Sequence, residues 1–191
     1  MKTMKKLPKN KRASINIIII LLLTAIFFSL FLSGKAFASP VNTAKLVELT
    51  NNERVNHGLK ALTIDPALTY AATLKASDMI NNHYFEHFSP SGKSPWDFIK
   101  SAKYYYEKAG ENLAMDFRTS EGMHDAWMKS PTHRDNILNP SYENLAIVAV
   151  NGVIDNHTTT LVVQMFGKPN LSRFRSLDTL INSVSGYILG Y

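Results

Sequence analysis

The chain has 191 residues, enough for one ordinary domain with additional segments at its ends. Apolar residues make up 45% and charged residues 19%, so we expect a packed globular core. No cysteine is present, which excludes disulfides, cysteine-based metal sites and thiol nucleophiles.

The formal net charge of +6 comes from the beginning of the chain. Seven of the 21 basic residues and no acidic residue precede Ser39, which leaves 14 basic and 15 acidic residues in the remainder. A domain with a net charge near −1 carries no electrostatic footprint for a phosphate backbone. The sequence therefore predicts no nucleic-acid partner.

Residues 1–38 have the pattern of an export signal. A basic stretch ends at Arg12, an apolar run covers residues 15–32, and Ala36-Phe37-Ala38 matches the small-x-small pattern of a cleavage site. The run of roughly 18 residues is also just long enough to span a bilayer. Two interpretations stay open, a cleaved signal peptide or an uncleaved membrane anchor. In both, the positive-inside rule places the rest of the chain outside the cell or on the outer face of the cytoplasmic membrane.

Helical spacing and capping residues predict most of the next segments. Val41, Ala44, Val47 and Leu46 give a first helix that stops at Asn56-His57-Gly58. Asp65-Pro66 opens a second helix that ends near residues 81–82. Its buried stripe is expected at Leu68, Ala71, Ala72, Ala76, Met79 and Ile80.

Residues 83–93 are expected to form a loop, and three shorter helical segments flank or follow the central part of the chain. Ser94-Pro95 opens a helix to about residue 102, Thr119 or Ser120 caps a helix containing Trp127, and Ser130-Pro131 caps one more short turn. Trp127 is expected in the core because it shares an apolar stripe with Met123.

The last part of the domain has strand patterns. Residues 145–150 and 160–166 are almost continuously apolar, and Asn151-Gly152 between them is typical of a turn. Strands without a polar face are covered on both sides. Because the helices come first and the hairpin last, we expect an α+β fold, a three-layer α-β-α sandwich without parallel βαβ winding.

Three residues are candidates for chemistry: His87, Glu111 and His133. Two imidazoles and a carboxylate suit a divalent ion such as zinc, and they also suit general acid-base work with Glu111 as the candidate catalytic residue. Each has an ordinary alternative: His133 follows a helix cap, Glu111 would bond loop amides, and His87 would pack on Phe85 and Phe88. Spacing alone does not bring the three together.

Five segments in order resemble the CAP superfamily of cysteine-rich secretory, antigen 5 and pathogenesis-related proteins, in its cysteine-free bacterial branch. The segments are Asn52-Glu53-Arg54 with Asn56-His57-Gly58-Leu59 and Leu62, His87 with Ser89-Pro90-Ser91-Gly92, Gly110-Glu111-Asn112-Leu113-Ala114, Trp127 to Leu138, and Val163-Gln164-Met165-Phe166-Gly167. The resemblance implies a CAP domain over residues 39–168. The tail at 169–191 keeps helical spacing of apolar residues, and it either packs on the domain or frays, or forms an amphipathic helix at a membrane surface.

The resemblance also implies a central cleft shared by His87, Glu111 and His133. In this family the two histidines, here His87 and His133, are able to bind Zn²⁺ or another divalent cation, and the Glu orients the site. Many eukaryotic members carry a second Glu three residues after the Trp, where this chain has Ser130. That departure weakens the case for hydrolysis.

Three functions follow as hypotheses. The first is an exported ligand-binding module whose cleft takes a lipid, glycan or peptide from the cell envelope or its surroundings. The second is a zinc-dependent hydrolase, and the third is a structural envelope protein held by an uncleaved leader.

Other residues are given ordinary roles. Ile137 and Leu138 are expected to anchor the His133 turn in the core, and Gln164 to bond a buried loop backbone. Surface packing is expected for Tyr104, Tyr105 and Tyr106, with a lipid or glycan groove as the alternative. Solvent or loop positions are expected for His57, His83, His124 and His157.

Overall fold

The computed structural model describes residues 41–172, so the leader at 1–38 and most of the tail lie outside the described residues. In this range the elements are α2 (Thr43–Asn56), β1 (Thr63–Ile64), α3 (Pro66–Asn81), α4 (Pro95–Ser101), β2 (Tyr106–Ala114), α5 (Ser120–Lys129), α6 (Pro131–Ile137), β3 (Asn144–Ile154) and β4 (His157–Pro169). No helix within these residues is long and apolar enough to cross a membrane.

The capping residues start the helices where the sequence predicts. Asp65 accepts a hydrogen bond from the Leu68 amide at 2.8 Å, with Pro66 in the first turn of α3. Ser94 and Asp97 form a capping box at α4, and Thr119 caps α5 through the Gly122 amide. Each of these contacts satisfies an amide that a helix start leaves unpaired.

The sheet has the order β1-β3-β4-β2, so β2 lies at one edge. β4 pairs antiparallel with both β3 and β2, whereas the two-residue β1 pairs parallel with β3. The pairing of β2 with β4 sets Glu111 opposite Met165 and Asn112 opposite Gln164. The sheet therefore brings the Gly110–Ala114 segment, which the sequence left unassigned, onto a fixed strand.

The predicted hairpin turn at Asn151-Gly152 is wrong. Both residues continue β3, and the chain reverses at Asp155 and Asn156, whose φ angles are 50° and 62°. Two successive positive φ angles match a type I′ turn, which Asp and Asn tolerate. Gly152 serves packing instead, because a Cβ there would collide with the side chain of Ile80 on α3.

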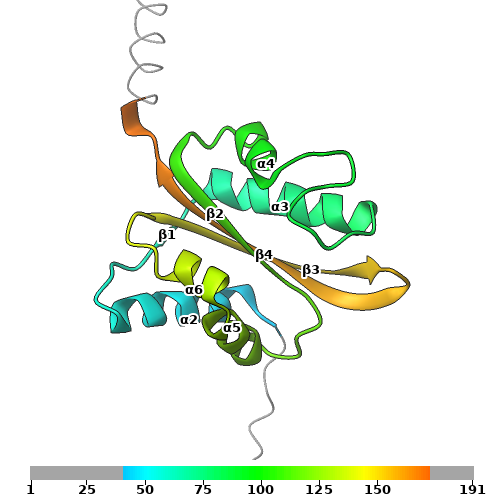
Figure 1. Cartoon of the computed structure of the whole chain (residues 1–191), viewed down its shortest axis with the longest axis horizontal. Helices are drawn as coiled ribbons and strands as arrows, with labels where there is room; N and C mark the ends of the chain where they lie inside the picture. The colour runs from blue at the N-terminus through cyan, green and yellow to red at the C-terminus, as the bar shows by residue number, and fades with distance from the viewer. Residues whose placement is uncertain (1–40, 173–191) are drawn as a thin grey trace, which may run out of the picture. The chain divides into compact units, whose positions relative to one another are not determined.

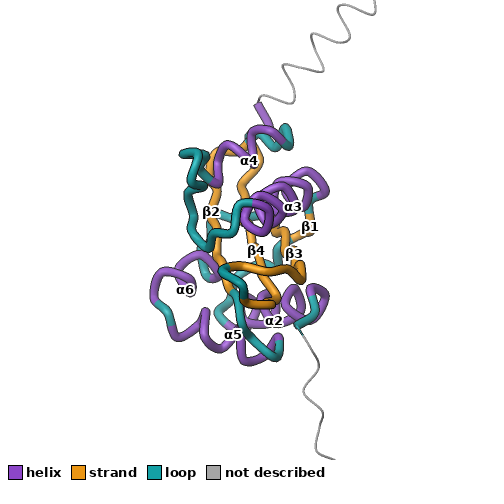
Figure 2. Tube along the Cα trace, turned by 90° about the vertical axis from the view of Figure 1, so that its right-hand side faces the viewer, coloured by secondary structure: helices purple, strands orange, loops and turns teal. Residues whose placement is uncertain are grey.

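Helices cover both faces of the sheet, as Figure 1 and the turned view in Figure 2 show. α3 and α4 lie on one side, and α2, α5 and α6 lie on the other. Each face has its own cluster of buried apolar side chains, one centred on Met79 and Met165 and the other on Trp127 and Phe166. The predicted three-layer α-β-α sandwich is confirmed, with two cores explaining the continuous apolar runs.

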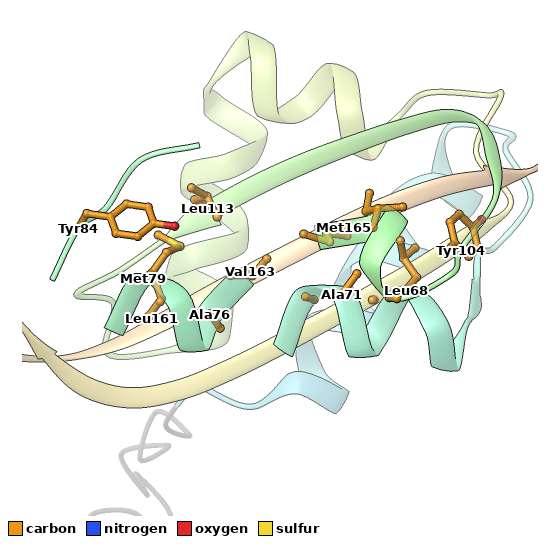
Figure 3. Close-up of a cluster of buried hydrophobic side chains, with 14 residues drawn as sticks. Leu68, Ala71, Ala76, Met79, Tyr84, Tyr104, Leu113, Leu161, Val163 and Met165 are labelled. Atoms are coloured by element: carbon orange, nitrogen blue, oxygen red, sulfur yellow. The ribbon is translucent and has the colours of Figure 1, made fainter. Parts of the chain in front are cut away.

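The core under α3 follows the predicted stripe (Figure 3). Leu68, Ala71, Ala72, Ala76 and Met79 are buried, and Ile80 packs at the margin of the same cluster. They contact Leu161, Val163 and Met165 of β4 together with Leu113 of β2. Burying one leucine, valine or methionine side chain stabilises a fold by about 1.5–3 kcal/mol, so this face is a main source of stability.

Several predicted positions are confirmed and others are wrong. Trp127 and Ile137 are buried as expected, and Leu46 rather than the exposed Ala44 anchors α2. His124 is only 4% exposed and Tyr104 only 3%, so neither has the surface position that the sequence suggested. Tyr104 reaches inward to donate to Asn144 Oδ1 at 2.8 Å.

Candidate functional site

A hollow of about 370 Å³ lies along edge strand β2, between the loop before α4 and helix α6. Its lining comes from four separate parts of the chain: His87 and Phe88 of the loop; Pro95 and Trp96 of α4; Ala109, Gly110 and Glu111 of β2; and Asn136 of α6. Two of the three candidate residues, His87 and Glu111, line this hollow.

His87 and Glu111 are in direct contact. The Nδ1 atom of His87 donates to Glu111 Oε1 at 2.7 Å, a short charge-assisted bond. The Glu111 side chain is 2% exposed and the His87 side chain 52% exposed, so the carboxylate forms the floor and the ring forms the rim. Because Nδ1 is committed to Glu111, Nε2 is the ring nitrogen open to a ligand.

The pair changes the acidity of both groups. The hydrogen bond to Glu111 raises the pKa of His87 above its ordinary 6.5, against the opposing effects of partial burial and the charge of Lys75. Burial raises the pKa of Glu111 above 4.5, while the bond from His87 and the charge of Lys75 act in the opposite direction. The imidazole therefore holds its proton to a higher pH than a free histidine does.

A buried lysine supports this pair from beneath. Lys75 of α3 is 0% exposed, and its Nζ donates to the carbonyl oxygens of Glu86 and His87 at 2.7 and 2.8 Å. A third bond at 3.2 Å joins it to the hydroxyl of Tyr84. Lys75 thus ties the His87 loop to α3 and places a positive charge near the Glu111 carboxylate.

One oxygen of the site lacks a partner. Glu111 Oε2 is buried and forms no hydrogen bond, whereas Oε1 accepts from His87. An unpaired buried polar atom costs about 1–3 kcal/mol, so such atoms in native proteins call for an explanation. Because Glu111 lines the hollow, a small rotation of its side chain would bring the buried Oε2 within reach of a ligand or water that donates a hydrogen bond there.

The opposite face of β2 carries a polar network that fixes the strand. Asn112 Nδ2 donates to Gln164 Oε1 at 2.9 Å and to the His133 carbonyl at 3.2 Å. Gln164 donates in turn to the Thr50 hydroxyl on α2 at 3.0 Å. The prediction that Gln164 bonds a loop backbone is therefore wrong, because its partners are side chains on a strand and a helix.

Asn136 links α6 to the strand that carries Glu111. Its Nδ2 donates to the Glu111 carbonyl at 3.1 Å and to Asn112 Oδ1 at 2.9 Å. Gly110 permits this approach, because a Cβ there would lie 2.8 Å from Asn136 Oδ1 and 2.5 Å from the Tyr142 hydroxyl. Asn136 therefore secures β2 to α6.

His133 lies close to the pair but is not bonded to it through its side chain. Its ring is partly buried in the first turn of α6, and its carbonyl accepts from Asn112. Burial lowers the pKa of His133 below 6.5, and the charge of His87 lowers it further. The two imidazoles therefore influence each other electrostatically, but only His87 and Glu111 are in contact.

These residues do not fit a metal site with three protein ligands. Within residues 41–172 no group of three or more His, Asp or Glu side chains is placed to hold a metal ion. A catalytic zinc normally takes three protein ligands plus water, and His87 and His133 supply two. The Oε1 atom of Glu111 is already bonded to His87. Ser130 occupies the position, three residues after Trp127, that would hold a second carboxylate in the resembled eukaryotic proteins.

Several residues that build the site were not predicted as site residues. Lys75, Asn112, Asn136 and Thr50 are polar side chains with buried or half-buried positions. Lys75 occurs within the apolar stripe of α3, between Ala72 and Ala76, and that position is the signal that could have indicated its burial. Nothing in the local pattern indicates the partners that these residues find across the fold.

Comparisons with known proteins agree with this architecture. The family model described as the cysteine-rich secretory protein family, or CAP, matches residues 47–166. The uncharacterized protein YkwD of Bacillus subtilis (strain 168) is 47% identical over 103 residues, which cover 54% of this chain and 40% of YkwD. The uncharacterized membrane protein YlbC of the same organism is 32% identical over 103 residues, or 30% of its length. The chain thus spans well under half of each relative.

Solved structures share the fold. An extracellular protein containing an SCP domain from Bacillus anthracis has a TM-score of 0.57 and 29% identity, over 66% of this chain and 40% of that one. An outer surface protein of Borrelia burgdorferi has a TM-score of 0.59 and 20% identity, over 70% of this chain and 100% of that one, which shows the fold alone. On the family match and this architecture, the chain belongs to the CAP, or cysteine-rich secretory protein, family.

Proposed function

We propose that the domain is an exported ligand-binding module and that the hollow along β2 is its binding site. The single observation that carries this proposal is the buried carboxylate of Glu111, which lines the hollow with one oxygen paired to His87 and the other unpaired. Buried carboxylate oxygens in native proteins rarely lack a hydrogen-bond partner, and a binding pocket is one place where a ligand provides that partner. A ligand that donates a hydrogen bond supplies that partner.

Binding is favoured over hydrolysis by the surroundings of the pair. The nearby hydroxyl of Ser89 contacts Ser91 Oγ and accepts from the Lys93 amide, both at 2.9 Å, and these contacts do not prepare it as a nucleophile. The donor set for a three-ligand zinc is absent from the described residues. Export is supported by the leader pattern at 1–38 and by the extracellular description of the Bacillus anthracis relative.

The test is a binding measurement that reports on His87. The full purified chain would be titrated with N-acetylglucosamine, glucose, decanoate and penta-alanine while the ring protons of His87 are followed by NMR. We expect at least one probe to shift the His87 resonances and to lose affinity in Glu111→Gln. His57→Ala is the control, because His57 is an exposed histidine away from the hollow. Shifts that persist unchanged in Glu111→Gln, or no shift with any probe class, would refute the proposal.

A further inference from the structure

Trp96 forms a wall shared by two neighbouring hollows. The first is the Glu111 hollow of about 370 Å³, and the second, of about 380 Å³, is lined by Trp96, Asp97, Lys100, Tyr104, Tyr105, Tyr106 and Asn170. Trp96 is 38% exposed, although it lies in the first turn of a helix whose neighbours Pro95 and Phe98 are buried. A large indole left half in water between two hollows marks this surface as a candidate for contact with a ligand.

The first hollow combines aromatic surface with the polar side chains of His87, Glu111 and Asn136. Phe88 on its rim is 62% exposed, and Trp96 faces the same space. Glu111 lines this hollow, and its buried Oε2 has no hydrogen-bond partner. The matching ligand is a ring with apolar C–H faces for the aromatic side chains and an O–H or N–H donor at its edge for the carboxylate.

The second hollow continues the same chemistry. Trp96 lies next to Tyr106, with ring centroids 6.4 Å apart and an interplanar angle of 47°. The hollow is lined by one acid, Asp97, and one base, Lys100, so its charges offset each other. Aromatic rings mixed with balanced polar groups suit a neutral, hydroxylated ligand. A fatty chain would leave Glu111 Oε2 unpaired and would also lie against two charged side chains.

We propose that the two hollows are consecutive subsites for an extended glycan that crosses Trp96. One sugar ring occupies the first hollow and donates a hydroxyl or acetamido N–H hydrogen bond to Glu111 Oε2. The next ring passes over Trp96 toward Tyr106. This inference rests on the proposed function, which it deepens by naming the ligand class and a second subsite.

Chain length is the property that tests the second subsite. The full chain would be titrated calorimetrically with N-acetylglucosamine oligomers of one to four units, and in parallel with glucose oligomers of the same lengths. We expect affinity to rise at least tenfold between one unit and three units in one or both series. The two series distinguish an acetamido donor from a hydroxyl donor, and a rise in either supports the proposal.

Three variants separate the subsites. Trp96→Ala is expected to remove most of the gain with length and, because Trp96 also lines the first hollow, to weaken single-ring binding by a smaller factor. Trp96→Phe is expected to be intermediate in both. Glu111→Gln is expected to weaken every oligomer by a similar factor. Tyr70→Ala is the matched control, because Tyr70 is an aromatic side chain, 55% exposed, that lines neither hollow. Circular dichroism would confirm that each variant is folded.

The outcomes distinguish failure of the glycan proposal from failure of the proposed ligand-binding function. Affinity independent of chain length, or a length effect that Trp96→Ala leaves intact, overturns the second subsite while the Glu111 hollow still stands. No glycan binding at millimolar concentration overturns the glycan class. If penta-alanine, whose amide N–H groups can donate, then binds and loses affinity in Glu111→Gln, the proposed function survives with another ligand. If every probe that binds has the same affinity for Glu111→Gln as for the parent chain, both the glycan proposal and the proposed function are refuted.

Discussion

Replacing Lys75 with methionine should destabilise the protein by about 2–4 kcal/mol. The methionine preserves most of the buried aliphatic stem but removes bonds to the carbonyls of Glu86 and His87 at 2.7 and 2.8 Å. A hydrogen bond from a charged donor contributes about 1.5–3 kcal/mol, and two of them set the scale of the loss. The variant no longer buries an ammonium group, and this gain offsets part of the loss. The expected destabilisation is therefore smaller than the sum of the two hydrogen-bond contributions.

The assay is urea unfolding of the full chain, analysed by linear extrapolation. The matched control is Lys129→Met, because Lys129 is an exposed lysine near the end of α5 and its replacement should change the free energy of unfolding by less than about 0.5 kcal/mol. The charge of Lys75 lowers the pKa of His87, so Lys75→Met should also raise that pKa. Equal unfolding midpoints for Lys75→Met, Lys129→Met and the parent chain would refute the role assigned to Lys75.

Three further predictions concern other buried or candidate polar groups. Burial lowers the pKa of His124 below 6.5, and both of its ring nitrogens lack partners, so the folded state favours the neutral ring. The contribution of His124 to the free energy of unfolding should be constant above about pH 6.5 and should fall by up to about 1.4 kcal/mol per pH unit below it. Urea midpoints measured across this pH range should show that slope in the parent chain and not in His124→Phe. An unchanged slope in the variant would contradict the assignment. Asn112→Leu should cost about 2–4 kcal/mol because it leaves Gln164 Oε1 and two other polar groups without their partner, and an unchanged urea midpoint would count against the network. Stoichiometric zinc should not raise the thermal midpoint, and a rise of several degrees that requires both His87 and His133 would show a metal site that the described donor set does not provide.

The layered fold was largely predictable because its signals are local. Asp65-Pro66, Ser94-Pro95 and Thr119 mark helix starts through contacts within four residues, and the stripe of α3 repeats at helical spacing. β3 and β4 were recognisable in their central parts from continuous apolar runs. Capping and periodicity depend on neighbouring residues, so one sequence is enough to detect them.

The edge strand was not predictable for the opposite reason. β2 has the sequence YEKAGENLA, with two glutamates, a lysine and a glycine, and it shows no apolar alternation. Its strand conformation depends on pairing with β4 and on the close approach that Gly110 permits to Tyr142. The hairpin turn was misplaced because Asn151-Gly152 carries the stronger turn signal, whereas Gly152 is used to make room for Ile80.

The residue types of the candidate site were predictable from the sequence, but the hydrogen bonds that connect them were not. Residue chemistry singled out His87, Glu111 and His133, family resemblance placed them in one cleft, and the structure joins the first two directly. The position of Lys75 in the apolar stripe indicates that its aliphatic stem is buried, but it does not indicate where the ammonium group lies, because such a lysine normally extends its charged end into water. Its burial depends on two carbonyls of a loop more than ten residues away, which no local pattern encodes.

The most direct test of the central claim is the pKa of His87, measured by NMR titration in the parent chain and in Glu111→Gln. The hydrogen bond to the buried carboxylate should hold the pKa of His87 above 6.5, and replacing the carboxylate with an amide should lower it. The stability that this pair contributes should be fully present below pH 6.5 and lost as the pH rises through the folded-state pKa. A parent pKa at or below 6.5 that does not respond to Glu111→Gln would contradict the account.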